Sequence, residues 1–331
     1  MQQRKSLSIF KLINTYFFKN KVGLLFSVLF PLFFMLVFFI VGSYAASGEN
    51  KEIMGMDTKN NNMAYFANGF PAFMTLTICP LSMLSLPTMN IEFRNSILLK
   101  KVKSSAVSKY EYNSIVFGYF MMMTFCATII TLTIYFLFLI GNYDLIKNFN
   151  WGTLIFGIFT LMIISITFAM FISTFIKSSF ACQIINIGIV LISLALSGQF
   201  LPIYLVGRID AIKYINLFSP LGYSQAAINV GTMPAFNGLD NTGLLINSSN
   251  GIFDWTSPFY YEYTMKVPNT NLPEQIQSFA NLLSEPEIMI EQKIPIRIYD
   301  VWQKVLDVFM PFILSGLFVF LSSYFFKWSN R

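Results

Sequence analysis

Six long apolar stretches dominate the pattern of hydrophobic and polar positions along the chain. Each reaches the length of about 20 residues that a helix needs to cross the hydrocarbon core of a bilayer. Few or no charged residues interrupt them. The pattern therefore predicts an all-α polytopic membrane protein with six transmembrane helices. These helices are expected near residues 22–44, 64–88, 114–141, 151–176, 180–206 and 304–326.

Polar segments divide the chain around these stretches. The polar pieces are an N-terminal arm, a loop after the second helix, and a long segment before the last one. The expected organisation is a cytoplasmic interfacial helix at 1–21, transmembrane helices one to five at 22–206 with a cytoplasmic loop at 89–113, an extracellular segment or small subdomain at 207–303, and the sixth helix with a short cytoplasmic tail at 304–331.

Basic residues gather on one side of the predicted helices. The arm, the 89–113 loop, Lys177 and the C-terminal tail together hold thirteen of the 22 lysines and arginines, against two acids. Loops rich in lysine and arginine stay on the cytoplasmic side of a membrane. The asymmetry therefore predicts a multi-pass protein of the cell (plasma) membrane with both termini in the cytoplasm.

Composition narrows the possible functions. Hydrophobic residues make up 55% of the chain and charged residues only 11%, which excludes a soluble protein of this size. The chain has no histidine, so histidine-based acid–base, nucleophilic and metal chemistry is excluded. No GxxxxGK[ST] motif occurs, so a bound nucleotide is not expected. The net charge of +6 follows from membrane topology and does not require nucleic acid as a partner.

The N-terminal arm has the periodicity of an amphipathic helix. Ile9, Leu12, Ile13, Tyr16 and Phe17 recur on one helical face, and lysines occupy the opposite face. Such a helix lies in the inner headgroup layer, where its lysines meet the anionic lipids of the bilayer. An ordinary basic flank of the first span is the alternative interpretation.

The segment 207–303 differs in composition from the rest of the chain. It is net acidic and rich in Asn, Pro, Gly and Tyr, and a loop of this length is seldom without structure of its own. The aromatic run FDWTSPFYYEYTMKV is typical of strands, whereas LPEQIQSFANLLSEPEIMIEQKI predicts a helix that starts near Pro273 and breaks around Pro286. A small external subdomain is expected here.

The loop IEFRNSILLKKVKSSAVSKYEYNSIVFGYF contains an acid, a short amphipathic piece, several basic residues and a serine-rich turn. Physically, it is a basic loop whose short helix is suited to docking a partner. Its pattern resembles the first cytoplasmic loop of the permease subunits of type-2 ABC exporters. The positions that match in order are Glu92, Leu99, Lys100, Lys101, Val102, Ser105, Val107, Ser108, Glu111 and Tyr112. Ala106 stands where that family usually has proline, and Ser96 or Ile97 where glycine is common.

A second stretch supports the same resemblance. INLFSPLGYSQAAI is similar to the N-P-L-x-Y-x-x-x-A segment that follows the fifth span in that family. The matching positions are Asn216, Pro220, Leu221, Tyr223, Ala226 and Ala227. The resemblance covers roughly 1–233 and 304–331, and the insertion at about 234–303 departs from the compact family pattern.

The resemblance implies a bacterial permease subunit that lacks its own motor. Two such chains, identical or homologous, would form the pathway, and separate ATP-binding subunits carrying ATP with Mg would dock beneath them. A coupling helix at about 92–103 would sit in a cleft of the ATPase, braced by the N-terminal helix. The coupling residues would be Glu92, Arg94, Leu99, Lys100, Lys101, Val102 and Lys103.

Buried charge is scarce in the predicted spans. Asp307, near the outer start of the sixth, is the exception. An acid inside a membrane is a candidate pathway residue, although snorkelling to the nearby interface explains it equally well. The absence of ionisable groups near the bilayer centre argues against a proton- or sodium-coupled carrier. The Phe-, Met-, Ser- and Thr-rich spans suit a hydrophobic or amphipathic substrate: a drug, an antimicrobial peptide or a lipid-like molecule.

The sequence leaves two other classes of function open. A membrane-embedded enzyme acting on lipid would need converging catalytic groups at the interface. A non-transporting sensor would use the 207–303 segment to bind a ligand or another membrane protein.

Overall fold

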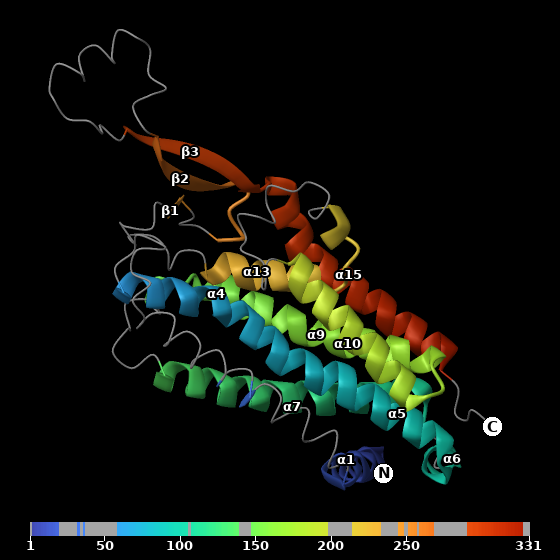
Figure 1. Ribbon diagram of the computed structural model, residues 1–331. Helices are drawn as coiled ribbons and strands as arrows, with labels where there is room; N and C mark the ends of the chain where they lie inside the picture. The colour runs from blue at the N-terminus through green and yellow to red at the C-terminus, as the bar shows by residue number, and fades with distance from the viewer. Residues whose placement is uncertain are drawn as a thin grey trace, which may run out of the picture.

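The computed structural model describes residues 2–19, 32–33, 36, 58–104, 107–138, 147–197, 214–232, 244–247, 251–256, 258–267 and 290–326. Within these ranges the chain is helical apart from one three-stranded sheet (Figure 1). The elements are α1 (Gln2–Lys19), α4 (Thr58–Cys79), the π-helix η1 (Pro80–Ser85), α5 (Leu86–Asn95), α6 (Ile97–Ser104), α7 (Lys109–Phe138), α9 (Trp151–Phe175), α10 (Ser179–Leu196), α13 (Gly222–Thr232), β1 (Leu244–Asn247), β2 (Phe259–Val267), β3 (Ile290–Tyr299) and α15 (Val301–Phe325).

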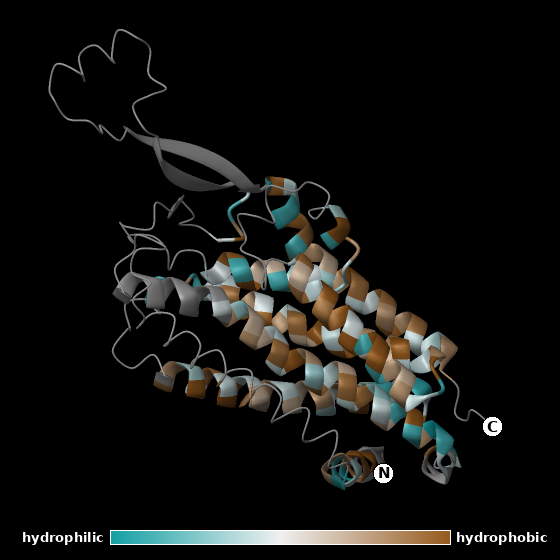
Figure 2. Cartoon of the chain, in the orientation of Figure 1, coloured by the Kyte–Doolittle hydropathy of each residue, from teal (hydrophilic) through white to brown (hydrophobic). Residues whose placement is uncertain are grey.

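Five helices among the described residues are long and apolar enough to cross a membrane. One is the continuous path of α4, η1 and α5 over Gly69–Asn95, and the others are α7, α9, α10 and α15. Figure 2 shows hydrophobic residues along their lengths. Five of the six predicted spans are therefore confirmed as helices. The first, predicted at 22–44, lies almost wholly outside the described residues.

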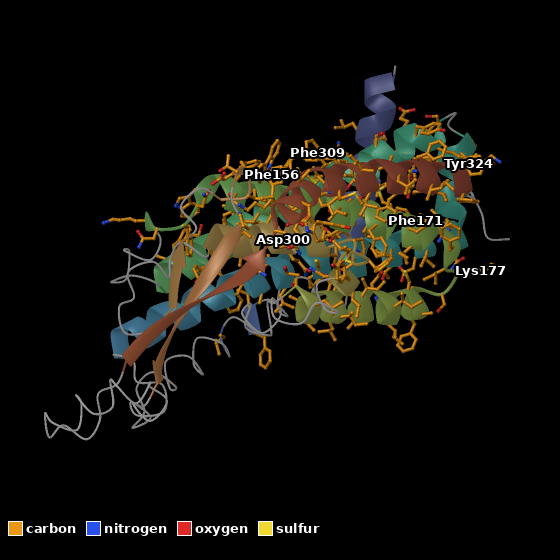
Figure 3. All side chains as sticks on the ribbon, turned by 90° about the horizontal axis from the view of Figure 1, so that it is seen from above. Phe156, Phe171, Lys177, Asp300, Phe309 and Tyr324 are labelled. Atoms are coloured by element: carbon orange, nitrogen blue, oxygen red, sulfur yellow. The ribbon has the colours of Figure 1, made fainter. Side chains whose placement is uncertain are left out.

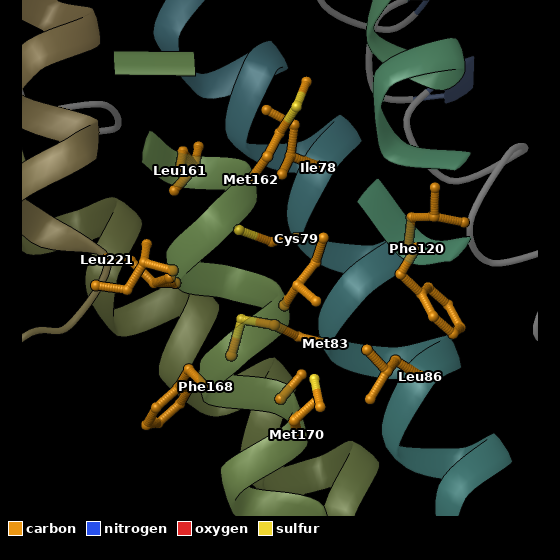
Figure 4. Close-up of a cluster of buried hydrophobic side chains, with 14 of the residues drawn as sticks. Ile78, Cys79, Met83, Leu86, Phe120, Leu161, Met162, Phe168, Met170 and Leu221 are labelled. Carbon is orange, nitrogen blue, oxygen red and sulfur yellow. The ribbon is translucent and has the colours of Figure 1, made fainter. Parts of the chain in front are cut away.

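The central helix of the bundle is α9, which contacts α15, α13, α5 and η1. Its hydrophobic side chains pack against those of the α4–η1–α5 path (Figure 4). The buried residues labelled there on the two sides are Ile78, Cys79, Met83 and Leu86, and Leu161, Met162, Phe168 and Met170. Because lipid is as apolar as these side chains, close packing, rather than escape from water, holds such helices together.

Two glycines allow α13 to approach α9 closely. A Cβ atom on Gly157 would lie 2.8 Å from the backbone nitrogen of Ile228, and one on Gly231 would lie 2.9 Å from the Cα of Leu154. Both distances are shorter than van der Waals contact, so only glycine fits at these positions. The resulting seam buries every residue of α13.

The burial of α13 corrects the expected position of the 207–303 segment. Residues Gly222–Thr232 lie in the helical bundle against α9, α15 and α4, and not in an external subdomain. Two of their polar side chains form hydrogen bonds to α10 and to the residue that follows it. Gln225 Oε1 accepts a hydrogen bond from Ser193 Oγ, and Asn229 Nδ2 donates to Ser197 O at 2.5 Å.

Three stretches of that segment, the strands β1, β2 and β3, form the sheet, so the all-α expectation does not hold for these strands. Its strand order is β1-β2-β3, and both pairs are antiparallel. The predicted strand character of the aromatic run is confirmed by β2. The C-terminal part of the predicted helix, residues 290–294, is instead the start of β3, in which Ile294, Ile296 and Ile298 alternate with other residues in the period of a strand. The rest of that predicted helix lies outside the described residues.

The described elements place the two ends of the chain together. In Figure 1, α1, α6 and the C-terminal end of α15 lie at one end of the bundle, and the sheet lies at the other. Figure 3 shows Lys177 and Tyr324 at the first end, which we call the α6 end, and Asp300 beside the strands at the second, the sheet end. The first described helix and the last turn of α15 therefore lie at the same end of the bundle.

A short loop attaches the sheet to the bundle. Gly251 has a φ of +69°, and the backbone N–H of Ile252 donates to Thr153 Oγ1 at 3.1 Å. Lys304 Nζ of α15 donates to Asp254 O at 2.8 Å. The loop 251–256 therefore bridges the N-terminal ends of α9 and α15.

The α9–α13 seam yields a prediction about stability. Gly157→Ala should lower the free energy of unfolding by about 1–3 kcal/mol, since the methyl group overpacks the seam against the α13 backbone. The matched control is Gly188→Ala on α10, where a Cβ would meet nothing within 4 Å. Thermal unfolding of the purified protein in detergent measures both. Equal midpoints for the two variants would contradict the tight approach.

Candidate functional site

A break in the chain at Ser96 separates α6 from the long helix before it. Ser96 adopts an extended conformation, with φ −97° and ψ 166°, and its N–H and Oγ donate to Phe93 O at 3.2 and 2.9 Å. The coupling helix expected at 92–103 therefore begins later, at Ile97. Glu92 and Arg94 instead belong to the last turn of α5, so the predicted loop residues divide between two helices.

The helix α6 is amphipathic in the structure as in the sequence. Leu99 and Val102 are buried, and Lys103 is exposed. Lys100 and Lys101 lie on the same helix, but their side chains are outside the described set. Figure 2 shows hydrophilic residues gathered where α5 meets α6. The predicted short amphipathic helix is thus present, at the end of the bundle that also holds α1.

Arg94 fastens the end of α5 to the end of α9. Its side chain is only 3% exposed. Its guanidinium donates to Thr174 O at 3.0 Å and Ile176 O at 3.1 Å, and also to Ser173 O. The last carbonyls of a helix have no partner within the helix, and a buried unpaired carbonyl is costly. Arg94 therefore acts as a cap for α9, rather than as an exposed cation of a docking loop.

Glu92 connects α5 to the N-terminal helix. Tyr16 Oη donates a hydrogen bond to Glu92 Oε2, and the Tyr16 ring stacks edge-on against Phe93 with centroids 4.6 Å apart. Burial, together with the hydrogen bond and charge of Glu92, raises the pKa of the Tyr16 phenol above its ordinary value. The phenol is therefore protonated at neutral pH and available as a donor.

The predicted apolar face of α1 is confirmed, and it packs mainly on protein. Ile9, Ile13 and Phe17 are buried, while Leu12 and Tyr16 are half-buried. Their neighbour is α7, whose Tyr119 and Phe120 rings lie 6.0 Å from the Phe17 ring. Tyr119 Oη also donates to Asn14 Oδ1 at 3.1 Å. The side chains of α1 left exposed for lipid are Leu7, Lys11, Phe18 and Lys19, among others.

Sequence reasoning missed a buried polar network behind these contacts. Tyr112 Oη of α7 donates to Asn90 Oδ1 at 3.2 Å, and Asn90 Nδ2 donates to Ser173 Oγ at 3.4 Å. Asn113 Nδ2 reaches Ser323 Oγ of α15 at 3.1 Å. In the sequence, the only indication of this network is that polar residues such as Asn90 and Asn113 occur within or beside apolar spans. The network joins α5, α7, α9 and α15 at the α6 end.

Asp307 lies apart from this site, toward the sheet end of α15. It is 4% exposed and sits six residues inside the helix, about 9 Å from its first residue at 1.5 Å per residue. One helical turn before it, Lys304 is fully buried beneath the loop 251–256. Burial among helices replaces the snorkelling interpretation, and the structure does not bring Asp307 together with the coupling residues.

The arrangement at the α6 end is mechanical in character. It holds the amphipathic helix α6, and the preceding helix α5 is connected by directional bonds to α1 and to the end of α9. Within the described ranges, no three His, Cys, Asp or Glu side chains come close enough to hold a metal ion. The site is therefore suited to transmitting a displacement between helices.

The five long apolar helices define a multi-pass membrane protein. Comparison with family models, with curated proteins and with solved structures finds no match for this chain.

The Arg94 contacts yield a second prediction. Arg94→Met keeps the length of the side chain but leaves three carbonyls at the end of α9 without their donor, so we expect a loss of about 2–4 kcal/mol in unfolding free energy. Lys103→Met, which removes an exposed cation eight residues beyond the end of α5, should change it by less than about 0.5 kcal/mol. Thermal unfolding in detergent provides the comparison. A Lys103 variant as unstable as the Arg94 variant would argue against the cap.

Proposed function

We propose that the chain is the membrane-spanning permease subunit of an ATP-driven ABC exporter. The observation that carries the proposal is α6, a separate amphipathic helix that projects from the end of the bundle where α1 and the last turn of α15 also lie. A partner that binds α6 is thereby connected to the membrane-spanning helices that α6 contacts through the chain. The basic residues that predict a cytoplasmic location gather at the same end.

The contacts of α5 support a route from α6 into the membrane. The chain passes from α6 to α5 through the single residue Ser96. Arg94 then links α5 to the end of α9, and Glu92 links it to α1 through Tyr16. A push on α6 therefore reaches the α9–α10 turn and the N-terminal helix together. Such directional contacts let a bound partner favour one arrangement of the helices over another.

The proposal implies several partners. Separate ABC ATP-binding subunits, with ATP and Mg bound to them, would dock on α6 from the cytoplasm. A second permease chain, identical or homologous, would complete the pathway in a bacterial plasma membrane. The exposed surfaces of α7, α10 and α15 carry many large apolar side chains, which suit contact with lipid. A hydrophobic or amphipathic substrate fits the scarcity of buried charge in the described spans.

Charge reversal on α6 tests this function. Lys100→Glu with Lys101→Glu should reduce substrate-stimulated ATP hydrolysis of the reconstituted complex at least tenfold, because an acidic helix would repel the surface that binds a basic one. Co-purification of the ATP-binding subunit with the tagged permease should fall in parallel. The matched control is Lys147→Glu, an exposed lysine four residues before α9, whose first turn contacts the loop 251–256.

Two results would contradict the proposal. If the double variant keeps wild-type stimulation and transport, then α6 is not the coupling helix. If tagged wild-type chain brings down no ATP-binding subunit from its native membranes, the exporter class itself is wrong.

A further inference from the structure

The second span of the bundle is interrupted in the membrane interior. Residues Pro80–Ser85 form the π-helix η1 between α4 and α5. A π segment inside an α-helical span widens the helix locally, and such segments are frequent at functional sites. Pro80 opens the segment and Pro87 follows it by two residues. Both remove a backbone N–H, so the span has two missing donors within eight residues.

The donor missing at Pro87 is supplied by another helix. In an α-helix the N–H of residue 87 would bond to the carbonyl of Met83, four residues earlier. Here Asn186 Nδ2 of α10 donates to Met83 O at 2.6 Å. Asn186 is fully buried, so this amide has no water to compete for it. Asn186 therefore occupies the place of the proline's absent N–H.

The bonds around this point divide the second span into two parts. Gln183 Nε2, one turn before Asn186 on α10, donates to Thr88 Oγ1 of α5 at 2.9 Å. Asn95 Nδ2, at the last residue of α5, donates to Lys177 O in the α9–α10 turn at 3.5 Å. The helix α5 is thus fixed to α10 near its N-terminal end and to the α9–α10 turn at its C-terminal end. On the far side of η1, Thr77 Oγ1 of α4 donates to Thr131 Oγ1 of α7 at 3.4 Å.

We propose that η1 is a hinge between α4 and α5, and that Asn186 is the positioning residue that latches it. Bending at Met83–Pro87 breaks no backbone bond from residue 87, because proline has none to give. The side-chain bond from Asn186 is what replaces it. Among the described residues, Asn186 Oδ1 has no hydrogen-bond donor although it is buried, so only the NH2 group of this amide is bonded. A latch of this kind can open without unwinding either helix.

The hinge would let the α6 end move relative to the sheet end. With the joint at Ser96 below and η1 above, α5 is a rigid segment between two flexible points. The identity of the trigger rests on the proposed function, in which the ATP-binding subunit acts on α6. The hinge itself is a property of this chain, so it is measured first on the permease alone.

A double substitution tests whether Asn186 replaces the proline's donor. Asn186→Leu leaves Met83 O without its donor, and the thermal midpoint in detergent should fall by about 5 °C. Pro87→Ala supplies a backbone N–H at the right position. The double variant P87A/N186L should therefore regain at least half of the lost midpoint. If N186L does not accumulate, recovery of folded protein in the double variant is the same rescue.

The matched control is Pro80→Ala, because the carbonyl that Pro80 leaves without a donor belongs to Leu76 and receives no bond from Asn186. P80A/N186L should keep the low midpoint of N186L. Equal rescue by both alanine substitutions, or by neither, would overturn the assignment, since the effect would then be general helix stabilisation or side-chain packing.

Hydrogen exchange reports the hinge motion itself. In the purified wild-type chain, amides at 81–89 should exchange at least tenfold faster than amides at 160–168 in the middle of α9. P87A should slow exchange at 81–89 by at least tenfold, as the restored backbone bond stiffens the joint. Equal rates in the two segments, or no effect of P87A, would overturn the hinge.

The same variant then separates the hinge from the function. In the complete transporter, P87A should bind the ATP-binding subunit as the wild type does, yet lose at least fivefold in substrate-stimulated ATP hydrolysis. Full stimulation with a stiffened joint would overturn the role of the hinge in transport. Absence of any ATP-binding partner would overturn the proposed function, while the exchange and rescue results stand.

Discussion

Backbone carbonyls that lose their helical partner inside a membrane bundle need another donor, and in three places of the described structure a second helix supplies it. In hydrocarbon no water can supply the missing bond. Arg94 serves the last carbonyls of α9, Asn186 serves Met83, and Asn229 serves Ser197 at the end of α10. In each case the donor comes from a different helix, so the point at which one helix is interrupted determines which other helix must lie beside it.

Apolar packing alone would not select this arrangement. A leucine on a membrane helix has about the same hydrophobic free energy in contact with lipid as in contact with protein. Selectivity comes from the places where packing is exceptionally close, such as Gly157 and Gly231 in the α9–α13 seam, and from the directional polar bonds. These two kinds of contact explain why α9 is at the centre. It offers glycine to α13 and open carbonyls to Arg94 of α5.

The long spans could be predicted because their length and lack of charge are local properties of the sequence. The partners of polar residues are not local. Arg94 looked like one more cation of a basic loop, since the carbonyls that bury it lie about 80 residues away. In the same way, the polar composition of 207–303 favoured an external segment, whereas Gln225 and Asn229 bond to Ser193 and Ser197, 32 residues earlier.

Two other differences have local causes. The break at Ser96 contains neither glycine nor proline, so the sequence predicts one helix over 92–103 where the structure has the end of α5 and the start of α6. The alternation of Ile294, Ile296 and Ile298 does predict a strand, but it follows a run of helix-forming residues that predicts the opposite. The predicted helix, which ends at Ile294, therefore overlaps the first residues of β3, and their strand structure follows from pairing with β2.

The second span is interrupted twice, at η1 and at Ser96, and the distance between these points determines how the span can move. Between η1 and Ser96 stands α5, ten residues long, which corresponds to about 15 Å of helix. Polar side chains fix this segment at both ends, through Gln183 above and through Arg94 and Asn95 below. A continuous α-helix would spread a displacement of α6 along its whole length. A short helix between two joints instead concentrates it, so that α5, the α9–α10 turn and the first part of α10 move as one body against the sheet end.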